Sequence, residues 1–417
     1  MGTIVKRKIV NDPVYGFINI PTPFLLDIID HPWFQRLRHI RQLGFAYLVY
    51  PGANHTRLQH AMGAMHLMEQ AIESLRGKGQ DITDHEAESA MAAMLLHDIG
   101  HGPFSHSLES AVISDMPHET LSLWFMEELN RQFDHKLDTA IKIFRGEYPK
   151  RFLCQLVSSQ LDVDRMDYLR RDSFFSGVVE GAIGSDRIIK MIDVYRDELV
   201  VEAKGIYSIE HFLIARRFMY WQVYLHKTGI AADNLLSGIL RRARYLALRK
   251  VHLPATDALR YFLYDYRPGS GDDPVLRRTI LGHFAMLDDD DICCAVKGWQ
   301  THADPILSRL CRQMTGRKLF RIKVQSAPFE KSTVDSYIAH TAAQYGISEE
   351  DAARYFVHTG RLSNNAYKNE GDERIKILAD RRPVDLATAS DMEHLSGLTT
   401  ENEKYFICFP KDIYILL

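Results

Sequence analysis

The chain has 417 residues, 46% of them hydrophobic and 25% charged, with a formal net charge of -3 at pH 7. This length exceeds that of one average domain, and the near-neutral charge argues against strong nucleic-acid binding. Five scattered cysteines with no CxxC motif, no apolar N-terminal segment and no run of membrane-spanning length predict a reduced protein of the cytoplasm that does not enter a membrane.

The N-terminal part predicts a hairpin followed by helices. Residues 4–20 alternate in polarity and contain Gly16 at a turn, which is typical of a short β-hairpin. From Thr22 onward the apolar residues follow helical spacing. Pro32 predicts a break between two helices, and Gly44 predicts the end of the second.

More helices are expected along the next 200 residues. His60–Leu75 is periodic, and Thr83 with Glu86 forms a capping box that opens a helix leading to His97. Further helical segments are expected at residues 121–130, 152–172 and 209–250. Residues 4–250 therefore predict one mostly helical domain.

The pattern changes after Pro254. A loop is expected at 265–274, strands at 318–325 and 404–409, and a helix within 348–360. We therefore predict a mostly α fold, with a helical catalytic domain over 1–253 and a smaller α+β region over 254–417 whose role the sequence does not indicate.

The pair His97-Asp98 follows the apolar run AMAAMLL. With His60 upstream and Asp164 downstream it makes a set of two imidazoles and two carboxylates. Such a set suits a borderline divalent metal that keeps positions open for water and substrate. The set predicts a metal-dependent phosphohydrolase.

Three more histidines lie near the metal set: His101, His106 and His118. Imidazole titrates near neutrality and suits proton transfer to a leaving oxygen or charge stabilisation on a phosphate. Glu109 lies one helical turn after His106 and could orient it, whereas isolated surface histidines are the alternative.

Cationic side chains occur near the same segments and could hold phosphate oxygens, with solvated helix faces as the alternative. They are Arg57, Arg165, Arg170, Arg171, Arg216, Arg217 and Lys227. Tyr168 and Tyr224 could stack on a base or pack against a sugar, although helical aromatic residues more often belong to a core.

Several motifs occur in order over residues 4–230: IIDHPWFQRLRHIRQLG, YPGANHTRLQHAMG, LLHDIGHGPFSH, LDVDRMDYLRRD and YLHK. This run resembles the HD-domain superfamily and, within it, the deoxynucleoside triphosphate triphosphohydrolases, which include the animal sterile-alpha-motif and HD-domain protein and bacterial relatives. The resemblance implies an HD-domain helical bundle. It also implies a divalent metal (iron, zinc, manganese or nickel) held by His60, His97, Asp98 and Asp164, with magnesium on the triphosphate.

The resemblance also implies roles for other residues. His106 would be the catalytic histidine, supported by Glu109, with His101 and His118 beside the phosphates. The substrate contacts would be Gln42, Leu43, Arg57, Arg165, Tyr168, Asp172, Arg216, Tyr224 and Lys227. An allosteric site for a GTP or dGTP activator would use Asn11, Asp30, Gln35, Arg38, Val49 and Tyr50. The protein is expected to form a homodimer or homotetramer.

These observations predict hydrolysis of a deoxynucleoside triphosphate (dNTP) to the deoxynucleoside and inorganic triphosphate. Two alternatives stay open. One is an HD-type phosphohydrolase or phosphodiesterase that acts on another nucleotide, because fold and metal set do not fix the substrate. The other is a regulator that binds a nucleotide or nucleic acid without turnover.

Overall fold

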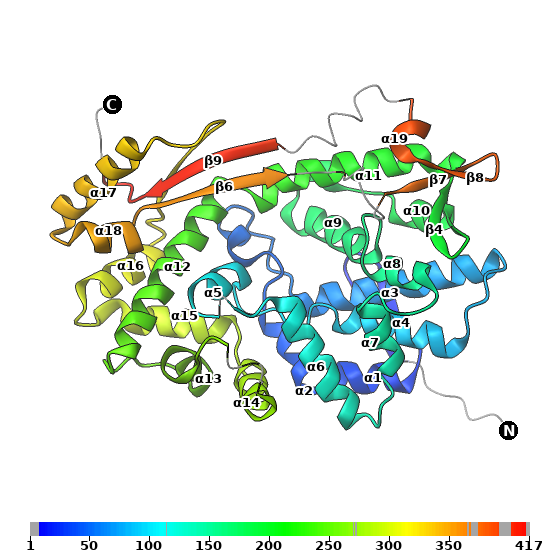
Figure 1. The fold of residues 1–417 in the computed structure, drawn as a ribbon, viewed down its shortest axis with the longest axis horizontal. Coiled ribbons are helices and arrows are strands. Elements are labelled where there is room, and N and C mark those ends of the chain that lie inside the picture. Colours follow the sequence, from blue (N-terminus) through cyan, green and yellow to red (C-terminus); the bar gives the residue numbers. More distant parts are fainter. Residues whose placement is uncertain are drawn as a thin grey trace.

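The structure, a computed structural model, describes residues 8–113, 115–269, 271, 273–364, 367, 374–391 and 402–413, apart from the side chains of Ser105, His106 and Ser110. Helices dominate the molecule, and small sheets lie near its N-terminus and in its C-terminal part (Figure 1). The predicted mostly α fold with a smaller α+β C-terminal region is confirmed. Within the described part of the chain, no helix is both long and apolar enough to cross a membrane.

The predicted N-terminal hairpin is present. β1 (Lys8–Asp12) and β2 (Gly16–Ile20) pair antiparallel, with Asp12 opposite Gly16. The Asp12 carboxylate accepts hydrogen bonds from the first backbone N–H groups of the turn. Gly16 has a φ of 79°, a left-handed conformation that favours glycine.

The helix break at Pro32 is also confirmed, but the second helix is shorter than predicted. α1 (Pro23–Asp30) is followed directly by α2 (Pro32–Gln35). The predicted continuation to Gly44 is wrong, because a 3-10 turn follows α2 and Arg41 then forms an isolated β-bridge with Thr56. A backbone that pairs with a distant segment cannot also complete helical hydrogen bonds.

Three helices make the centre of the bundle: α3 (Arg57–Gly77), α4 (Asp84–Leu96) and α9 (Val163–Ser176). α3 packs against both α4 and α9. Gly63 lets α3 approach α9 closely, because a Cβ there would lie 2.0 Å from Asp167 Oδ1. The surrounding helices are α5 (Ser105–Ala111), α6 (His118–Gln132), α7 (Asp138–Phe144), α8 (Arg151–Val157) and α10 (Ser185–Met191).

The helix predicted over residues 152–172 is interrupted between α8 and α9. Asp162 caps α9, because its carboxylate accepts from the backbone N–H of Arg165 at 2.7 Å and from that of Ser159 at 2.9 Å. The single-helix prediction is wrong here, since local side-chain capping competes with helical hydrogen bonds.

The helix predicted over residues 209–250 is likewise divided. α11 (Ile206–Met219) passes into a π-helical turn, η5 (Tyr220–Tyr224), before α12 (Lys227–Leu248) begins. His226 caps α12, with Nδ1 accepting from the backbone N–H of Thr228 at 3.1 Å. π-helical turns inside helices are frequent at functional sites, and this one lies beside the cavity described below.

The C-terminal part combines helices with two sheets. Its helices are α13 (Asp257–Arg260), α14 (Pro274–Phe284), α15 (Asp289–Gly298), α16 (Pro305–Thr315), α17 (Lys331–Tyr345), α18 (Glu349–Tyr355) and α19 (Leu386–Ala389). The loop predicted over 265–274 lies between the π-helical turn η6 (Tyr261–Asp265) and Pro274, where α14 begins.

β5 (Arg321–Gln325) and β9 (Asn402–Phe409) confirm the two predicted strands. The helix expected within 348–360 ends at Tyr355, and β6 (His358–Asn364) follows, so that part of the prediction is wrong. Residues 358–364 form a strand because they pair antiparallel with β9.

The C-terminal strands lie at two ends of the molecule (Figure 1). β5, β9 and β6 form one sheet near α17, and the β6–β9 ribbon reaches from there toward α11. A second sheet has the strand order β3 (Ile192–Tyr195), β4 (Glu198–Glu202), β7 (Lys376–Ala379) and β8 (Arg382–Asp385).

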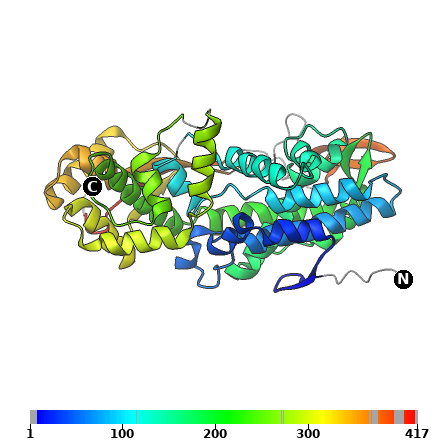
Figure 2. The same ribbon diagram turned by 90° about the horizontal axis from the view of Figure 1, so that it is seen from below.

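The β4–β7 pair is parallel and brings a late segment of the chain to the helical bundle. One large buried cluster contains residues from both the bundle and the C-terminal part. The view in Figure 2 shows the elongated outline of the molecule. The division into 1–253 and 254–417 stays a prediction.

Candidate metal centre and active site

Three of the four predicted metal ligands meet at one point. His60 lies in the first turn of α3, His97 caps the end of α4, and Asp164 lies in the first turn of α9. His60 Nε2 is 3.0 Å from Asp164 Oδ1 and 3.3 Å from His97 Nε2. One donor atom from each of the three lies within 4.8 Å of the others, which suits a shared ion.

Asp98, the fourth predicted ligand, lies beside this group. Its Oδ1 is 3.4 Å from His97 Nε2, and its Oδ2 is 3.8 Å from His60 Nε2. Oδ2 also accepts a hydrogen bond of 2.6 Å from Arg57 Nη1. Asp98 thus lies close to the three residues that meet, and its role as a fourth ligand stays a prediction.

A buried chain of charges supports His60 from behind. Asp167 Oδ2 is 2.8 Å from His60 Nδ1, so the ring presents Nε2 to the centre. Arg171 donates to both Asp167 oxygens and, at 2.7 Å, to Asp12 of the hairpin. Asp167 was not predicted as a site residue, although its position three residues after Asp164 places both carboxylates on one helix face.

The turn that carries His97 and Asp98 is fixed by hydrogen bonds. His97 Nδ1 lies 2.6 Å from the Met94 carbonyl, which again directs Nε2 to the centre. The Ser122 hydroxyl donates to the His97 carbonyl and accepts from the Gly100 N–H. A Cβ at Gly100 would lie 2.2 Å from the His118 carbonyl, so this close approach requires glycine.

Arg36 holds the same turn from the other side. Its buried guanidinium donates to the carbonyl groups of Ile99, His101 and Leu287. This role of Arg36 could not be predicted from the sequence, because Arg36 lies in a segment that predicts an ordinary amphipathic helix.

The charge balance of the centre fits a divalent cation. Burial by itself lowers the pKa of His60, but hydrogen bonds with Asp164 and Asp167 outweigh burial and raise this pKa to about 10. Burial also opposes protonation of His97, yet Asp98 and Asp164 raise its pKa. A site that draws protons onto buried imidazoles lacks positive charge, which a metal ion bound by His60, His97, Asp98 and Asp164 would supply.

Next to the metal set lies a pair of stacked imidazoles. The His101 and His118 rings are 3.8 Å apart and nearly parallel. Burial, followed by the nearby Arg57, lowers the pKa of His101 to about 3. His118 differs, because Glu109 at 3.6 Å and Glu119 outweigh burial and raise the pKa of His118.

Glu109 was predicted to orient His106. The His106 side chain lies outside the described residues, so this pairing stays a prediction. The structure instead shows the Glu109 carboxylate beside His118 Nδ1.

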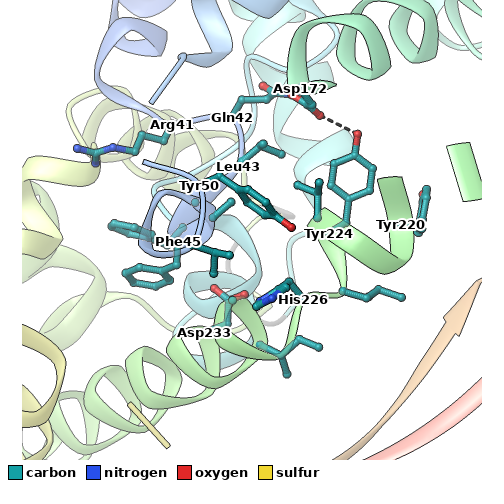
Figure 3. A pocket seen from close by; sticks show the side chains of 18 of the residues that line it. Arg41, Gln42, Leu43, Phe45, Tyr50, Asp172, Tyr220, Tyr224, His226 and Asp233 are labelled. Carbon is teal, nitrogen blue, oxygen red and sulfur yellow. Dashed lines mark hydrogen bonds between the residues drawn. The ribbon is translucent and has the colours of Figure 1, made fainter. Parts of the chain in front are cut away.

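A cavity of about 550 Å³ is lined by residues of α3, α9 and α12 (Figure 3). Six of the predicted substrate contacts line it: Gln42, Leu43, Arg57, Tyr168, Asp172 and Tyr224. Arg57 also binds Asp98, and so connects the cavity to the metal set. The cavity lining also includes Phe45, Phe104, His226 and Asp233, which the sequence analysis did not single out as site residues.

One wall of the cavity contains the polar side chains of Asp172 and Tyr224, and His55 supports Asp172 from behind this wall. His55 Nε2 is 2.7 Å from Asp172 Oδ1, and the Tyr224 hydroxyl donates to Asp172 Oδ2 at 2.8 Å. The His55 side chain is fully buried and stacks on Phe175. Tyr168 meets Tyr224 edge to face, which extends this wall. The sequence predicted Asp172 and Tyr224 but not His55.

The remaining predicted cations lie outside the cavity lining. Arg165 bonds the Ser159 carbonyl and Asp162, Arg216 is buried against Tyr220, and Lys227 is exposed at the start of α12. Arg170 pairs with Asp186. Arg171 is completely buried between Asp167 and Asp12, so the suggestion that it holds phosphate is wrong.

The predicted activator contacts Asp30, Gln35 and Arg38 adjoin one another, because Gln35 donates to the Ile29 carbonyl and accepts from Arg38. Their role in binding an activator stays a prediction. Asn11 is exposed on the hairpin, and Asp30 pairs with Lys8. Val49 and Tyr50 instead line the cavity that holds the predicted substrate contacts.

Comparison with known proteins agrees with this site. Residues 57–195 match the HD domain and residues 183–260 match the HD associated region. A solved phosphohydrolase from Bacteroides thetaiotaomicron has 49% sequence identity and a TM-score of 0.93, over 97% of this chain and 100% of that chain. The chain belongs to the HD-domain phosphohydrolases.

Two curated relatives are more distant. The uncharacterized protein YwfO of Bacillus subtilis is 29% identical, over 99% of this chain and 94% of its own length. The deoxynucleoside triphosphate triphosphohydrolase SAMHD1 homolog of Dictyostelium discoideum is 30% identical over 57% of this chain. This second match spans only 50% of the Dictyostelium protein.

Proposed function

We propose that this protein hydrolyses dNTPs to the deoxynucleoside and inorganic triphosphate. The observation that carries the proposal is the Asp172–Tyr224 hydrogen bond, supported from behind by His55, in a cavity that Arg57 joins to the metal set. The match to the Dictyostelium SAMHD1 homolog supports the same substrate class.

In the proposed reaction, water attacks the α-phosphorus and the bond from this phosphorus to the 5′-oxygen breaks. The 5′-oxygen takes a proton, so the products are the deoxynucleoside and triphosphate. When bound, a divalent ion stabilises charge on phosphoryl oxygens and makes water a better nucleophile at neutral pH. Iron, zinc, manganese or nickel are the metals we propose for the four ligands, with magnesium on the triphosphate.

The protein's own side chains hold and neutralise the substrate. Arg57 places a guanidinium between the metal set and the cavity. Glu109 favours the protonated form of His118, whose imidazolium would then stabilise phosphate charge. We assign delivery of the proton to the 5′-oxygen to His106, as the family resemblance implies.

The wall formed by Asp172 and Tyr224, with His55 behind it, accounts for a preference for deoxyribose. Both Asp172 oxygens already accept hydrogen bonds, one with His55 and one from Tyr224. A ribose 2′-hydroxyl pressed against this wall would compete with His55 and Tyr224 for the Asp172 oxygens, and this competition costs binding energy.

The test is product analysis. Metal-loaded protein is incubated with each dNTP, and with the matching NTPs, and the products are separated by anion-exchange chromatography. We expect a nucleoside and triphosphate from dNTPs and slower reaction of NTPs. Release of phosphate or diphosphate, or no turnover of any dNTP by protein with bound metal, would replace this proposal with another phosphoester substrate.

Activation and assembly are separate proposals. We propose a homodimer or homotetramer that GTP or dGTP activates. Turnover with and without GTP, together with light scattering, tests both points. Unchanged turnover and a monomeric mass would rule them out.

A further inference from the structure

Asp233 is a carboxyl group in the cavity that the proposed reaction does not use. It belongs to α12 and lines the cavity together with Gly229 and Ile230 of the same helix (Figure 3). The Ser107 hydroxyl donates to its Oδ1 at 3.3 Å. Among the described residues, no lysine, arginine or histidine forms an ion pair with it.

Asp233 is half-buried, and a carboxylate that is shielded from water without a nearby cation is costly to keep charged. Burial raises the pKa of Asp233 to about 7, although the Ser107 hydrogen bond opposes this rise. Groups held in such surroundings inside a cavity are candidates for contact with a ligand. Among the described side chains, only the Ser107 hydroxyl bonds the Asp233 carboxylate, and this bond is to Oδ1.

The surroundings of Asp233 suit a nucleobase. Phe45 and Phe104, whose rings stack at 4.4 Å, line the cavity together with Ile230, so apolar surface lies next to the carboxyl group. Figure 3 shows Phe45 and Asp233 across the cavity from the Asp172–Tyr224 hydrogen bond. A nucleotide whose sugar lies at Asp172 would direct its base toward this apolar side.

His226 adds a donor to the same cavity. Its Nδ1 accepts from the backbone N–H of Thr228, so the proton of the neutral ring is on Nε2. Burial, with the neighbouring Lys227, lowers the pKa of His226, which favours this neutral form. The cavity therefore offers one N–H donor from His226 and carboxylate acceptors from Asp233.

We propose that Asp233 is a specificity-determining residue that selects guanine as the base of the substrate. This inference rests on the proposed function. Guanine presents one acceptor, O6, followed by two adjacent donors, N1–H and N2–H. His226 Nε2–H matches the acceptor and the Asp233 carboxylate matches the two donors. Adenine, cytosine and thymine have no two adjacent donors, so each would leave one carboxylate contact unmatched.

The test is equilibrium dialysis of the full chain with the four deoxynucleoside 5′-monophosphates and with deoxyinosine 5′-monophosphate, which lacks the guanine amino group. Wild-type protein is expected to bind dGMP at least about tenfold more tightly than the other three monophosphates. It is expected to bind dIMP about tenfold more weakly than dGMP. The dIMP comparison needs no variant, so it holds even where a substitution impairs folding.

Asp233→Asn sharpens the test, because an amide offers one donor and one acceptor and so matches adenine. We expect this variant to lose the dGMP preference and the difference between dGMP and dIMP, and to gain affinity for dAMP. Asp81→Asn removes the same charge from a carboxylate that is 92% exposed and should change nothing. Equal binding of all bases by the wild type, or an unchanged dGMP preference in Asp233→Asn, would overturn the inference.

Hydrolysis of dGTP is assayed in parallel. Guanine-selective binding without dNTP turnover would overturn the proposed function and leave the base contact standing. Turnover of all four dNTPs without base preference in binding would overturn the base contact alone.

Discussion

At the metal centre, His60, His97 and Asp98 each have a second partner: Asp167, the Met94 carbonyl and Arg57 respectively. The cavity next to it has one strongly hydrogen-bonded wall, whereas Phe45, Phe104 and Ile230 contribute apolar surface. The first region allows one geometry, because buried charges tolerate little displacement. The second has fewer fixed polar contacts, and in the proposed function it is the region that selects the substrate.

The largest effect is expected at the metal set. Asp164→Ala removes a ligand and leaves His60 and His97 without their shared carboxylate. Turnover should fall about 1,000-fold or more, equivalent to about 4 kcal/mol of transition-state stabilisation. Mass spectrometry of the metal content should show the ion depleted. Normal turnover by metal-depleted Asp164→Ala protein would exclude the metal-dependent reaction.

The support behind His60 comes next. Asp167→Asn should weaken metal affinity about 10- to 100-fold, because the charge that orients the imidazole is lost. Asp12→Asn is the matched control, since it removes the other carboxylate of Arg171 but does not touch His60. Both variants break a buried ion pair, so the free energy of unfolding of each should fall by about 3–5 kcal/mol.

Metal titrations of the two variants separate the two roles. Asp167→Asn should lose metal affinity and Asp12→Asn should keep it. Equal metal affinity in both would mean that the chain behind His60 serves stability alone.

The polar wall of the cavity is tested through His55. His55→Ala leaves Asp172 without its buried partner, so Asp172 and Tyr224 can shift. The dNTP-to-NTP ratio of kcat/KM should fall about tenfold, the cost of one unmatched buried group. His55→Gln, which can keep the donor to Asp172, should restore most of the ratio. A ratio unaffected by His55→Ala would remove this wall from sugar selection.

The smallest effect is expected in the helix that leads to His97. Glu86 caps α4, and although burial opposes its ionisation, Lys150, Thr83 and Tyr148 lower its pKa to about 2. The folded pKa lies below the ordinary value, so the stability that Glu86 adds is present at neutral pH and is lost as the pH falls toward 2. Glu86→Gln should lower the free energy of unfolding by about 1–2 kcal/mol at pH 7.

Chemical unfolding of wild type and Glu86→Gln between pH 7 and pH 2.5 gives the difference between the two proteins at each pH. This difference should shrink on acidification while turnover at pH 7 is unchanged. A difference that is constant with pH would mean that the Glu86 charge does not stabilise α4.

Sequence motifs identified the class of the protein and the residues of the candidate metal centre. His60, His97 and Asp164 lie in short motifs on helices whose apolar periodicity is strong, so both the helices and their polar ends could be predicted. The two C-terminal strands near 321–325 and 402–409 were also evident from local alternation.

The positions of long polar and aromatic side chains depend on the packing of distant segments. Arg171 is a residue type that often binds phosphate, but here it forms a buried ion pair with Asp12. The two residues are 159 positions apart, and the hairpin brings Asp12 to Arg171. The π-turn η5 and the strand β6 depend on partners distant in sequence, which no local pattern encodes. Asp233 is an ordinary helical residue in the sequence, and it faces a cavity only because α12 packs against α5.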